Sequence, residues 1–401
     1  MLKSITSIQV KEKTILVRAD LNSTVNEGKI LVGARLIEHA KTIKLLSSNK
    51  AKVVVLSHQG RKGDLDCISL KSHLIELEKL SGKKIFFCSW KEDFKKKISS
   101  LKNGEILLME NTRFLDFESE EKTPEEHSQN EIIKALASVS NVFVLDALSV
   151  SHRSHASVVG FIPLIPSFMG PVLEAEIANL DKALNSKESP RLLILGGAKP
   201  EDSLKTLKFF LEENKTDSVL VAGIFGELFL VAEGIKFGEK DVFFESKGFT
   251  SFLPEIKSMK EKFSSKIFIP KDFTIKENNS RKEIEVSDLP INSVTKDIGK
   301  KTIQEFSEKI SRAKLIVFNG TPGVFEEPIF AEGTKAVLKS MKENKGFTFI
   351  GGGDTGTALN SLGFSSSDFS FVSLSGKASL KYLSGKKLVA VEALKNSSLT
   401  L

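Results

Sequence analysis

The chain has 401 residues, of which 40% are hydrophobic and 27% are charged. A chain of this length buries large apolar cores, and about 150 residues per domain favours two or three domains. No apolar stretch approaches the roughly 18 residues of a membrane span, and the N-terminus lacks the apolar region of a signal peptide. Because Cys67 and Cys88 are the only cysteines and no zinc-ligand spacing occurs, we expect a cytoplasmic protein without structural zinc.

Lysine and arginine exceed aspartate and glutamate by 58 to 51, which gives a net charge of +7. This surplus alone fits either a nucleic acid or a small anionic substrate. Basic and acidic residues alternate in segments such as 91–97 and 257–266, which is typical of solvated helix faces. Zinc-finger and aromatic RNA-binding motifs are absent from the sequence, so we expect neither a nucleic acid nor a membrane as partner.

Apolar runs of strand length alternate with segments of helical periodicity such as Arg35–Leu46. The expected strands are Thr14–Val17, Val53–Leu56, Ile106–Met109, Val142–Leu145, Leu192–Leu195, Ser218–Ala222, Leu315–Phe318 and Phe347–Ile350. Uninterrupted apolar strands are typical of parallel sheets that are buried on both faces. The sequence therefore predicts an α/β fold of parallel sheets wrapped by helices, with ligands at the carboxyl ends of the strands.

The residues that follow the expected strands differ between the two halves of the chain. Up to about Pro166 they include arginine and histidine, whereas beyond about Pro190 they are glycines with single charged residues. An amphipathic helix predicted over Pro171–Leu184 would join the two halves. Two sheet domains with different ligands are the expected organisation.

A glycine-rich turn, Gly351-Gly352-Gly353, follows one expected strand and opens a helix predicted over Thr355–Leu362. Glycines let a phosphate approach the backbone, and a helix N-terminus supplies free amide donors. Asp354 could hold Mg2+ on the nucleotide oxygens, since Mg2+ usually binds one or two carboxylates together with phosphates. The alternative is an ordinary turn in which Asp354 caps the helix.

The N-terminal half contributes a set of basic side chains near strand ends. The set comprises Arg18, Arg35, His58, Arg61, Arg113, His152, Arg153 and His155. Several arginines converging from strand ends would suit a small acid that carries a phosphate, although a surface ion pair is the commoner role of any single arginine. His152 and His155 also have the spacing of two metal ligands on a helix, but no third ligand is evident.

In this order the segments resemble phosphoglycerate kinase from about Leu16 to Ala393. The matching segments are Val17–Asn22, Leu56–Arg61, Met109–Phe114, Asp146–Ala147 with His152–Ser157, Leu195–Lys199, Asp297–Gly299, Asn319–Glu326 and Gly351–Thr355. The resemblance implies reversible phosphoryl transfer between ATP and 3-phosphoglycerate, with ADP and 1,3-bisphosphoglycerate as products, in glycolysis or gluconeogenesis. It further implies a monomer.

The resemblance also implies two Rossmann-like lobes, each a parallel sheet wrapped by helices, joined by a helix and a hinge that closes. The expected parts are a phosphoglycerate-binding lobe over 1–169, a connecting helix over 170–187, a nucleotide-binding lobe over 188–376 and a segment over 377–401 that returns to the first lobe.

By the same resemblance, site residues fall in both lobes. Those expected to hold 3-phosphoglycerate are Asp20, Asn22, His58, Arg61, Arg113 and Arg153, with Arg35 reaching the transferred phosphoryl group. The nucleotide residues implied are Gly196, Gly197, Lys199, Asn319, Gly320, Gly323, Glu326, Gly351, Gly352, Gly353, Asp354 and Thr355. Arg35 and Lys199 would act in catalysis, and Asp354 would hold Mg2+ through the nucleotide.

The sequence departs from the family pattern mainly on the nucleotide side. Ser203 stands where a second lysine is usual, and Ile224 lies within a normally glycine-rich loop, Ala222–Gly226. A threonine and three glycines are replaced by Leu374–Lys377, where Lys377 could restore the missing charge. These departures leave a second class open, a related binding protein with weak or no transfer activity.

Overall fold

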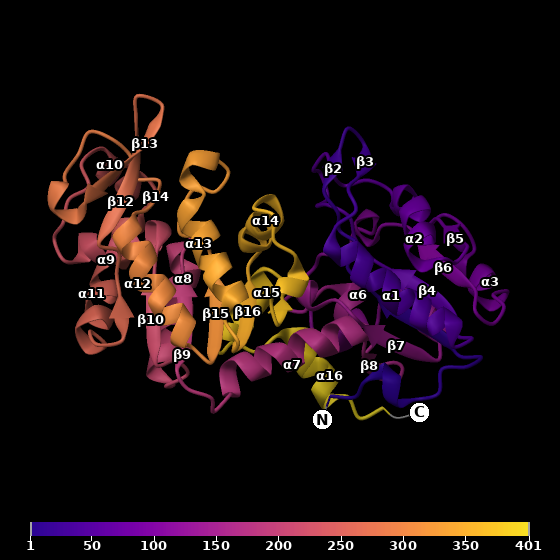
Figure 1. Ribbon diagram of the computed structural model, residues 1–401. Helices are drawn as coiled ribbons and strands as arrows, with labels where there is room; N and C mark the ends of the chain where they lie inside the picture. Colours follow the sequence, from indigo (N-terminus) through magenta and orange to yellow (C-terminus); the bar gives the residue numbers. More distant parts are fainter. Residues whose placement is uncertain (1, 400–401) are drawn as a thin grey trace. The chain divides into compact units, whose positions relative to one another are not determined.

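The computed structural model describes residues 2–399, which form two compact units (Figure 1). The first unit runs to Ala178 and includes the segment from Lys387 onward, and the second unit is Asn179–Lys386. The division falls inside α7 (Pro171–Asn185), the helix predicted over Pro171–Leu184. The residue ranges predicted for the lobes stay predictions.

The first unit is built on a six-stranded sheet in the order β5-β6-β4-β1-β7-β8, and all its strand pairs are parallel. Its strands are β1 (Thr14–Arg18), β4 (Lys52–Leu56), β5 (Ile85–Cys88), β6 (Ile106–Met109), β7 (Val142–Leu145) and β8 (Ser167–Met169). Every residue of β1, β6 and β7 is buried. The uninterrupted apolar runs in the sequence follow from this burial on both faces.

Helices surround this sheet, and a short hairpin precedes the first of them. The helices are α1 (Ala34–Ser48), α2 (Leu74–Ser81), α3 (Phe94–Ser99), α4 (Pro124–His127), α5 (Glu131–Ser138), α6 (Ala156–Val159) and α16 (Val389–Asn396), and the hairpin pairs β2 (Val25–Asn26) with β3 (Lys29–Ile30). The helix α16 packs against α6 and β8. The C-terminal segment thus belongs to the first unit, although it follows the second unit in sequence.

The second unit has its own six-stranded parallel sheet in the order β11-β10-β9-β15-β16-β17. Its strands are β9 (Arg191–Leu195), β10 (Ser218–Val221), β11 (Ile267–Phe268), β15 (Leu315–Asn319), β16 (Phe347–Gly351) and β17 (Phe371–Val372). Leu192, Ile194, Ile316, Phe318 and Ile350 join one core with side chains from the helices. The predicted class of two α/β lobes with parallel sheets is confirmed.

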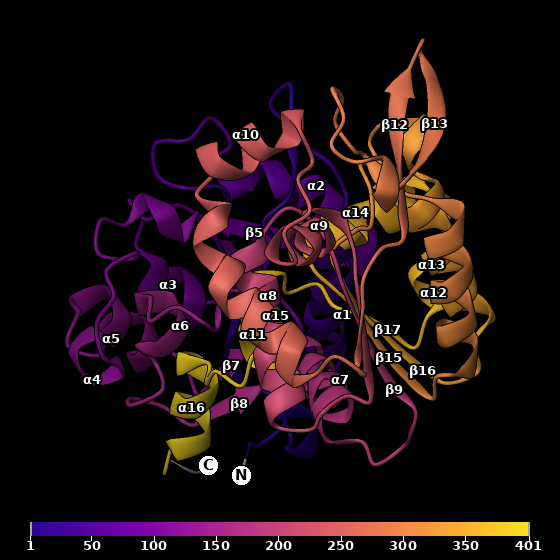
Figure 2. The same cartoon turned by 90° about the vertical axis from the view of Figure 1, so that its left-hand side faces the viewer.

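Helices lie on both sides of the second sheet. Figure 2 shows α12 and α13 on one side and α8 and α11 on the other. The helices are α8 (Pro200–Glu212), α9 (Gly223–Ala232), α10 (Glu239–Ser246), α11 (Leu253–Lys262), α12 (Lys300–Arg312), α13 (Glu332–Glu343), α14 (Gly353–Ser361) and α15 (Lys377–Leu383). The predicted helix over Thr355–Leu362 is α14, which begins two residues earlier.

The second unit also contains a separate antiparallel sheet that the sequence patterns do not predict. It contains β12 (Asp272–Glu277), β13 (Ser280–Glu285) and β14 (Asp297–Ile298) in the order β13-β12-β14. The turn residues Asn278 and Asn279 both have positive φ, at 49° and 60°. An Asn-Asn pair between strands is typical of tight hairpin turns, so the signal was present, but the charges on β13 masked the strand.

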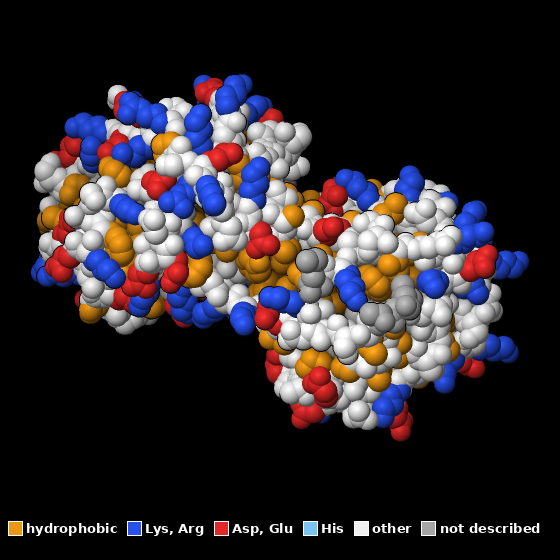
Figure 3. Space-filling view, turned by 90° about the horizontal axis from the view of Figure 1, so that it is seen from below, with side chains coloured by type: hydrophobic (Ala, Val, Ile, Leu, Met, Phe, Trp, Pro, Cys, Tyr) orange, Lys and Arg blue, Asp and Glu red, His pale blue; other side chains and the backbone are white. Residues whose placement is uncertain are grey.

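Basic and acidic side chains are interspersed on the face shown in Figure 3. Among residues 2–399, many basic and acidic side chains form exposed ion pairs, such as Lys41 with Glu38 at 2.6 Å and Lys208 with Glu255 at 2.9 Å. This pattern agrees with solvated helix faces as the explanation of the lysine-rich segments. Within residues 2–399, no helix combines the length and the apolar character that a membrane crossing requires.

Candidate functional site

Basic side chains of the first unit meet at the carboxyl ends of three neighbouring strands. Arg18 ends β1, His58 follows β4, and Arg113 follows β6, and these strands lie side by side in the order β6-β4-β1. A guanidinium nitrogen of Arg18 lies 3.2 Å from Nδ1 of His58, and Arg18 Nε donates to Ser157 Oγ at 2.8 Å. The parallel sheet therefore gathers residues that are separated by up to 95 positions in sequence.

Asp20 and Arg35 form an ion pair at this edge, with 3.5 Å between their charged atoms. Asp20 is buried and accepts a hydrogen bond from the Asn22 amide at 3.1 Å and another from the Ser149 hydroxyl. Burial alone would raise the pKa of Asp20, but the charge of Arg35, assisted by the Ser149 hydrogen bond, outweighs it and holds that pKa well below its usual range. An ionised carboxylate in this position orients Arg35 on the first turn of α1.

The buried histidines beside the arginines are neutral at physiological pH. Burial, reinforced by the charge of Arg18, lowers the pKa of His58 to about 3. Burial and the charges of Arg113 and Arg153 lower the pKa of His155 to about 3 as well. The positive charge available to an anion at this edge therefore comes from the arginines.

The remaining predicted acid-phosphate residues lie around Arg113. Its side chain is buried and donates to Ser119 Oγ, while its Nε has no hydrogen-bond partner among residues 2–399. The charges of Arg153 and Arg61 both act on it, and Arg61 is exposed. Asn22 accepts from the Gly60 amide at 2.9 Å, which ties the loops after β1 and β4 together. The structure thus gathers the predicted set into one basic region of the first unit.

Two features of this region differ from expectation or were missed. His152 and His155 do not share a helix, because residues 151–155 are not helical and α6 begins only at Ala156. Glu118 was not singled out, yet its buried carboxylate accepts from the Ser157 amide at 2.9 Å. Burial lowers the pKa of both Arg18 and Arg113, and the charge of Glu118 opposes this shift. Nothing in the sequence marks Glu118 as the counter-charge, because it comes from a loop.

His73, which contacts the loop after β1, makes the stability of the fold depend on pH. Its buried ring contacts the Leu21 carbonyl at 3.1 Å, but burial dominates and lowers its pKa from 6.5 to about 4. Between those values the unfolded chain binds more protons than the folded chain, so this contribution is present above pH 6.5 and is lost as pH falls. When pH is lowered from 7 to 5, the free energy of unfolding measured with urea is expected to fall by about 2 kcal/mol more in wild type than in His73→Gln. Equal losses would contradict this assignment.

Glycine turns of the second unit gather at the carboxyl ends of β9, β15 and β16, which are adjacent in the sheet. The Gly197 amide donates to the Thr321 carbonyl at 2.8 Å, and the Gly320 amide donates to Thr355 Oγ1 at 2.9 Å. Gly320 has φ +86°, and a Cβ there would lie 2.3 Å from the Gly196 carbonyl oxygen. Only glycine permits the turns to pack this closely.

Lys199 and Asp354 approach each other beside these turns. Their charged atoms are 3.0 Å apart, and both side chains are largely exposed. Asn319 is buried at the end of β15, and its Oδ1 has no hydrogen-bond partner within residues 2–399. These predicted nucleotide residues therefore lie together, with a lysine, a carboxylate and the N-terminus of α14 facing one region.

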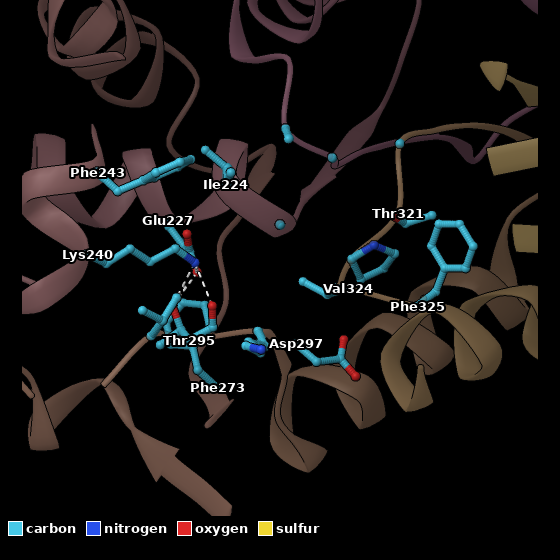
Figure 4. Close-up of a pocket in the computed structure, with 18 of the residues that line it drawn as sticks. Ile224, Glu227, Lys240, Phe243, Phe273, Thr295, Asp297, Thr321, Val324 and Phe325 are labelled. Atoms are coloured by element: carbon cyan, nitrogen blue, oxygen red, sulfur yellow. Dashed lines mark hydrogen bonds and ion pairs between the residues drawn. The ribbon is translucent and has the colours of Figure 1, made fainter. Parts of the chain in front are cut away.

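A cavity of about 770 Å³ adjoins the glycine turns within the second unit (Figure 4). Of the predicted nucleotide residues, Gly197, Gly320, Gly323, Glu326 and Asp354 line it. Its size lies in the range of small-molecule sites. The sequence patterns missed most of the rest of the wall, chiefly Glu227, Lys240, Phe243 and Thr295.

The Asp297–Gly299 motif contributes Asp297 to the wall of the cavity. Asp297 accepts from the Gly333 amide at 2.8 Å and from the Ile298 amide at 2.9 Å. Burial raises its pKa to about 7, although the Gly333 amide opposes the shift. A Cβ at Gly323 would lie 2.2 Å from Asp297 Oδ1, so this glycine is required by packing.

The departures from the family pattern have distinct surroundings. Ser203 is buried in α8, and its hydroxyl lies 3.4 Å from the Gly196 carbonyl oxygen, so it contacts the glycine turn from behind. Lys377 is exposed at the start of α15, which packs against α8. Ile224 lies in the first turn of α9 and lines the cavity.

Comparison with known proteins places these two units in one family. A family model described as phosphoglycerate kinase matches residues 5–386. A phosphoglycerate kinase of Methanothermobacter thermautotrophicus is 36% identical, over 98% of this chain and 97% of that protein. One from Archaeoglobus fulgidus is also 36% identical, over 98% and 96% of the two chains.

Solved structures give the same result. The crystal structure of phosphoglycerate kinase from Pyrococcus horikoshii OT3 matches with a TM-score of 0.91 and 33% identity, over 99% of both chains. That of Coxiella burnetii matches with a TM-score of 0.84 and 27% identity, over 98% of this chain and 99% of that chain. The chain therefore belongs, as its sequence predicts, to the phosphoglycerate kinase family of phosphotransferases.

Proposed function

We propose that this protein transfers a phosphoryl group reversibly between ATP and the carboxylate of 3-phosphoglycerate. One observation carries the proposal: the glycine turns after β9, β15 and β16, the Lys199–Asp354 pair and a nucleotide-sized cavity adjoin one another in the second unit. Phosphates bind well where glycine backbone and a helix N-terminus meet. The relatives named phosphoglycerate kinase support the same activity.

The arginine-rich edge of the first unit suits 3-phosphoglycerate, which carries a carboxylate and a phosphate. Arg61, Arg113 and Arg153 are assigned to the phosphate end, since guanidinium groups bind phosphate through paired hydrogen bonds. Asp20, Asn22 and His58 are assigned to the remaining polar groups of the substrate. The unpartnered Nε of buried Arg113 supports this assignment, because a bound anion would give it a partner.

The proposed chemistry depends on charge rather than on proton transfer. The attacking carboxylate of 3-phosphoglycerate is already ionised at neutral pH, so no general base is needed. Phosphoryl transfer needs positioning and neutralisation of the equatorial oxygens. We assign these roles to Lys199, to Arg35 and to the amides at the start of α14, which have no partner within the helix.

Asp354 suits a Mg2+ ion that is shared with the nucleotide. The carboxylate of Asp354 is exposed in the first turn of α14. It pairs with the ammonium group of Lys199, which is exposed as well. Residues 2–399 contain no cluster of three or more His, Cys, Asp or Glu side chains that could hold a metal alone. One carboxylate with nucleotide phosphates is a usual Mg2+ environment. When bound, Mg2+ would neutralise phosphate charge.

The alternative of a binding protein without transfer activity gains no support from the relatives, which carry the name of the enzyme. Ser203 removes one cation, but Lys199, Glu326 and Asp354 are retained beside the cavity. We also propose that the protein works as a monomer in glycolysis or gluconeogenesis in the cytoplasm. The free thiols of Cys67 and Cys88 fit a reducing compartment.

Calorimetric titration with 3-phosphoglycerate tests the acid site. Arg61→Ala and Arg113→Ala are each expected to weaken binding by about tenfold or more, since a charge-assisted pair contributes about 1.5 to 3 kcal/mol. Lys62→Ala is the matched control, because this exposed neighbour of Arg61 pairs with Asp116 instead. Unchanged affinity in both arginine variants would refute the proposed pocket.

Gly353 provides a test on the nucleotide side. A Cβ there meets nothing within 4 Å and its φ is ordinary, so the fold itself does not require glycine. We expect Gly353→Ala to keep or raise the unfolding temperature but to weaken ADP binding by about tenfold, because the methyl group occupies space that a phosphate needs. The control is Gly356→Ala in the same helix, where a Cβ also meets nothing within 4 Å. If both variants bind ADP like wild type, phosphates do not approach Gly353.

A further inference from the structure

A charged cluster lies within the wall of the cavity in the second unit. Glu227 on α9, Lys240 on α10 and Thr295 all line the cavity, and Figure 4 shows them joined by hydrogen bonds. Lys240 Nζ lies 2.6 Å from Glu227 Oε1, and both side chains are more than nine-tenths buried. The catalytic scheme above uses none of these residues.

Counting the hydrogen bonds shows which group of the cluster is left without a partner. Lys240 Nζ donates to Glu227 Oε1 at 2.6 Å, to the Thr295 carbonyl at 2.6 Å and to Thr295 Oγ1 at 3.0 Å. The Thr295 hydroxyl donates its only hydrogen to Glu227 Oε1 at 2.5 Å. All ammonium and hydroxyl hydrogens of the cluster are thus used. Glu227 Oε2 is buried and has no partner among residues 2–399.

A carboxylate oxygen without a partner is costly in a buried place, so a ligand that supplies a donor gains from it. The surrounding wall is apolar, with Ile224, Phe243, Phe273 and Val324 among its side chains. Such a wall suits the flat faces of an aromatic ring, whereas Glu227 supplies one polar contact at the ring edge. The cluster offers an acceptor and no free donor.

We propose that Glu227 Oε2 accepts a hydrogen bond from the exocyclic amine of adenine and thereby selects adenine nucleotides. This inference rests on the proposed function, in which the second unit binds a nucleotide. Adenine presents an amine donor at its 6-position, whereas hypoxanthine and guanine present a carbonyl oxygen there. That oxygen would face the carboxylate and repel it. Purine without a 6-substituent would leave Glu227 Oε2 unpaired.

The proposal is tested by calorimetric binding of nucleoside diphosphates to the full-length protein. ADP is compared with inosine diphosphate, guanosine diphosphate and purine riboside diphosphate, which keep the ribose and phosphates. We expect wild type to bind ADP at least about tenfold more tightly than each of the others, as a buried charge-assisted hydrogen bond requires. Equal affinity for ADP and purine riboside diphosphate, or for ADP and guanosine diphosphate, would overturn the proposal.

The variant Glu227→Gln provides a second test of the proposed contact between Glu227 and the base. The amide oxygen is expected to keep the place of Oε1, because Lys240 and Thr295 both donate to that position. The amide NH2 then replaces Oε2 and turns the acceptor into a donor. The preference for ADP over inosine diphosphate should disappear or reverse. If this variant kept the wild-type preference, Glu227 would not contact the base.

Two controls separate failure of this inference from failure of the proposed function. Calorimetric unfolding of Glu227→Gln, compared with that of wild type, reports whether the second unit, which contains Glu227, remains folded. If the variant does not fold, the wild-type comparison of the four nucleotides decides the proposal alone. Wild type that binds none of the four nucleotides would refute the proposed function itself, whereas equal binding of all four would refute only the role of Glu227.

Discussion

Replacing Arg35 with alanine is expected to lower kcat by about a hundredfold to a thousandfold, the cost of removing one preorganised group that stabilises transition-state charge. Arg35 lies at the start of α1 and pairs with the buried Asp20 carboxylate at 3.5 Å, while its side chain stays partly exposed. Its proposed partner is charge that develops during transfer, so KM for 3-phosphoglycerate should change much less. Steady-state kinetics with each substrate varied in turn measures both quantities.

Two further variants identify the reason for that loss. Arg35→Lys keeps the charge but loses the planar fork, so we expect an intermediate kcat. Lys41→Ala, on the same helix, removes an exposed cation that pairs with Glu38 and should leave kcat unchanged. An Arg35→Ala enzyme with a higher KM and an unchanged kcat would make Arg35 an ordinary substrate ligand.

Replacing Asp354 with asparagine is expected to lower kcat by about a hundredfold or more and to abolish the gain in ADP affinity that Mg2+ provides. The substitution removes the charge beside Lys199 and the N-terminus of α14, but it preserves the shape of the side chain. Binding of ADP in the absence of Mg2+ should change little, because the glycine amides remain. Calorimetry with and without Mg2+ measures the difference.

The matched control for Asp354 is Glu201→Gln in α8, an exposed carboxylate that pairs with Lys205. This variant should keep both kcat and the Mg2+ effect. Asp354 would be only a helix cap if Asp354→Asn bound ADP with the same Mg2+ dependence as wild type.

The core strands could be predicted because burial on both faces leaves an unbroken apolar run. The runs at Thr14–Val17 and Ile106–Met109 correspond to β1 and β6 within one residue. By contrast, β5 and β17 went unrecognised, since β5 has an exposed Phe86 and β17 has only two residues. Strands at the edge of a sheet have one paired neighbour, so their sequence carries a weaker signal.

The site could be predicted where its residues follow strand ends. Arg18, His58 and Arg113 meet because parallel pairing brings successive carboxyl ends to one edge, and the same rule gathers Gly196 and Gly320. Their places in the fold follow from topology, and their roles remain proposals that the variants above test.

The cavity wall could not be predicted in the same way. Glu227 and Lys240 lie on two helices, α9 and α10, and meet only through tertiary packing. Their spacing of 13 residues matches no helical or strand period that would signal a contact. Buried charge pairs of this kind become visible only when the fold is known.

Transfer itself is the central claim, and one measurement tests it most directly. The purified full-length protein is mixed with Mg2+, 3-phosphoglycerate and ATP labelled on the γ-phosphorus, and hydroxylamine converts the acyl phosphate to a hydroxamate with release of the labelled phosphate. We predict that hydroxamate forms catalytically, that its formation requires both substrates, and that Arg35→Ala slows it by about a hundredfold or more. Tight binding of ATP and 3-phosphoglycerate without any hydroxamate would contradict the account and would instead establish a binding protein.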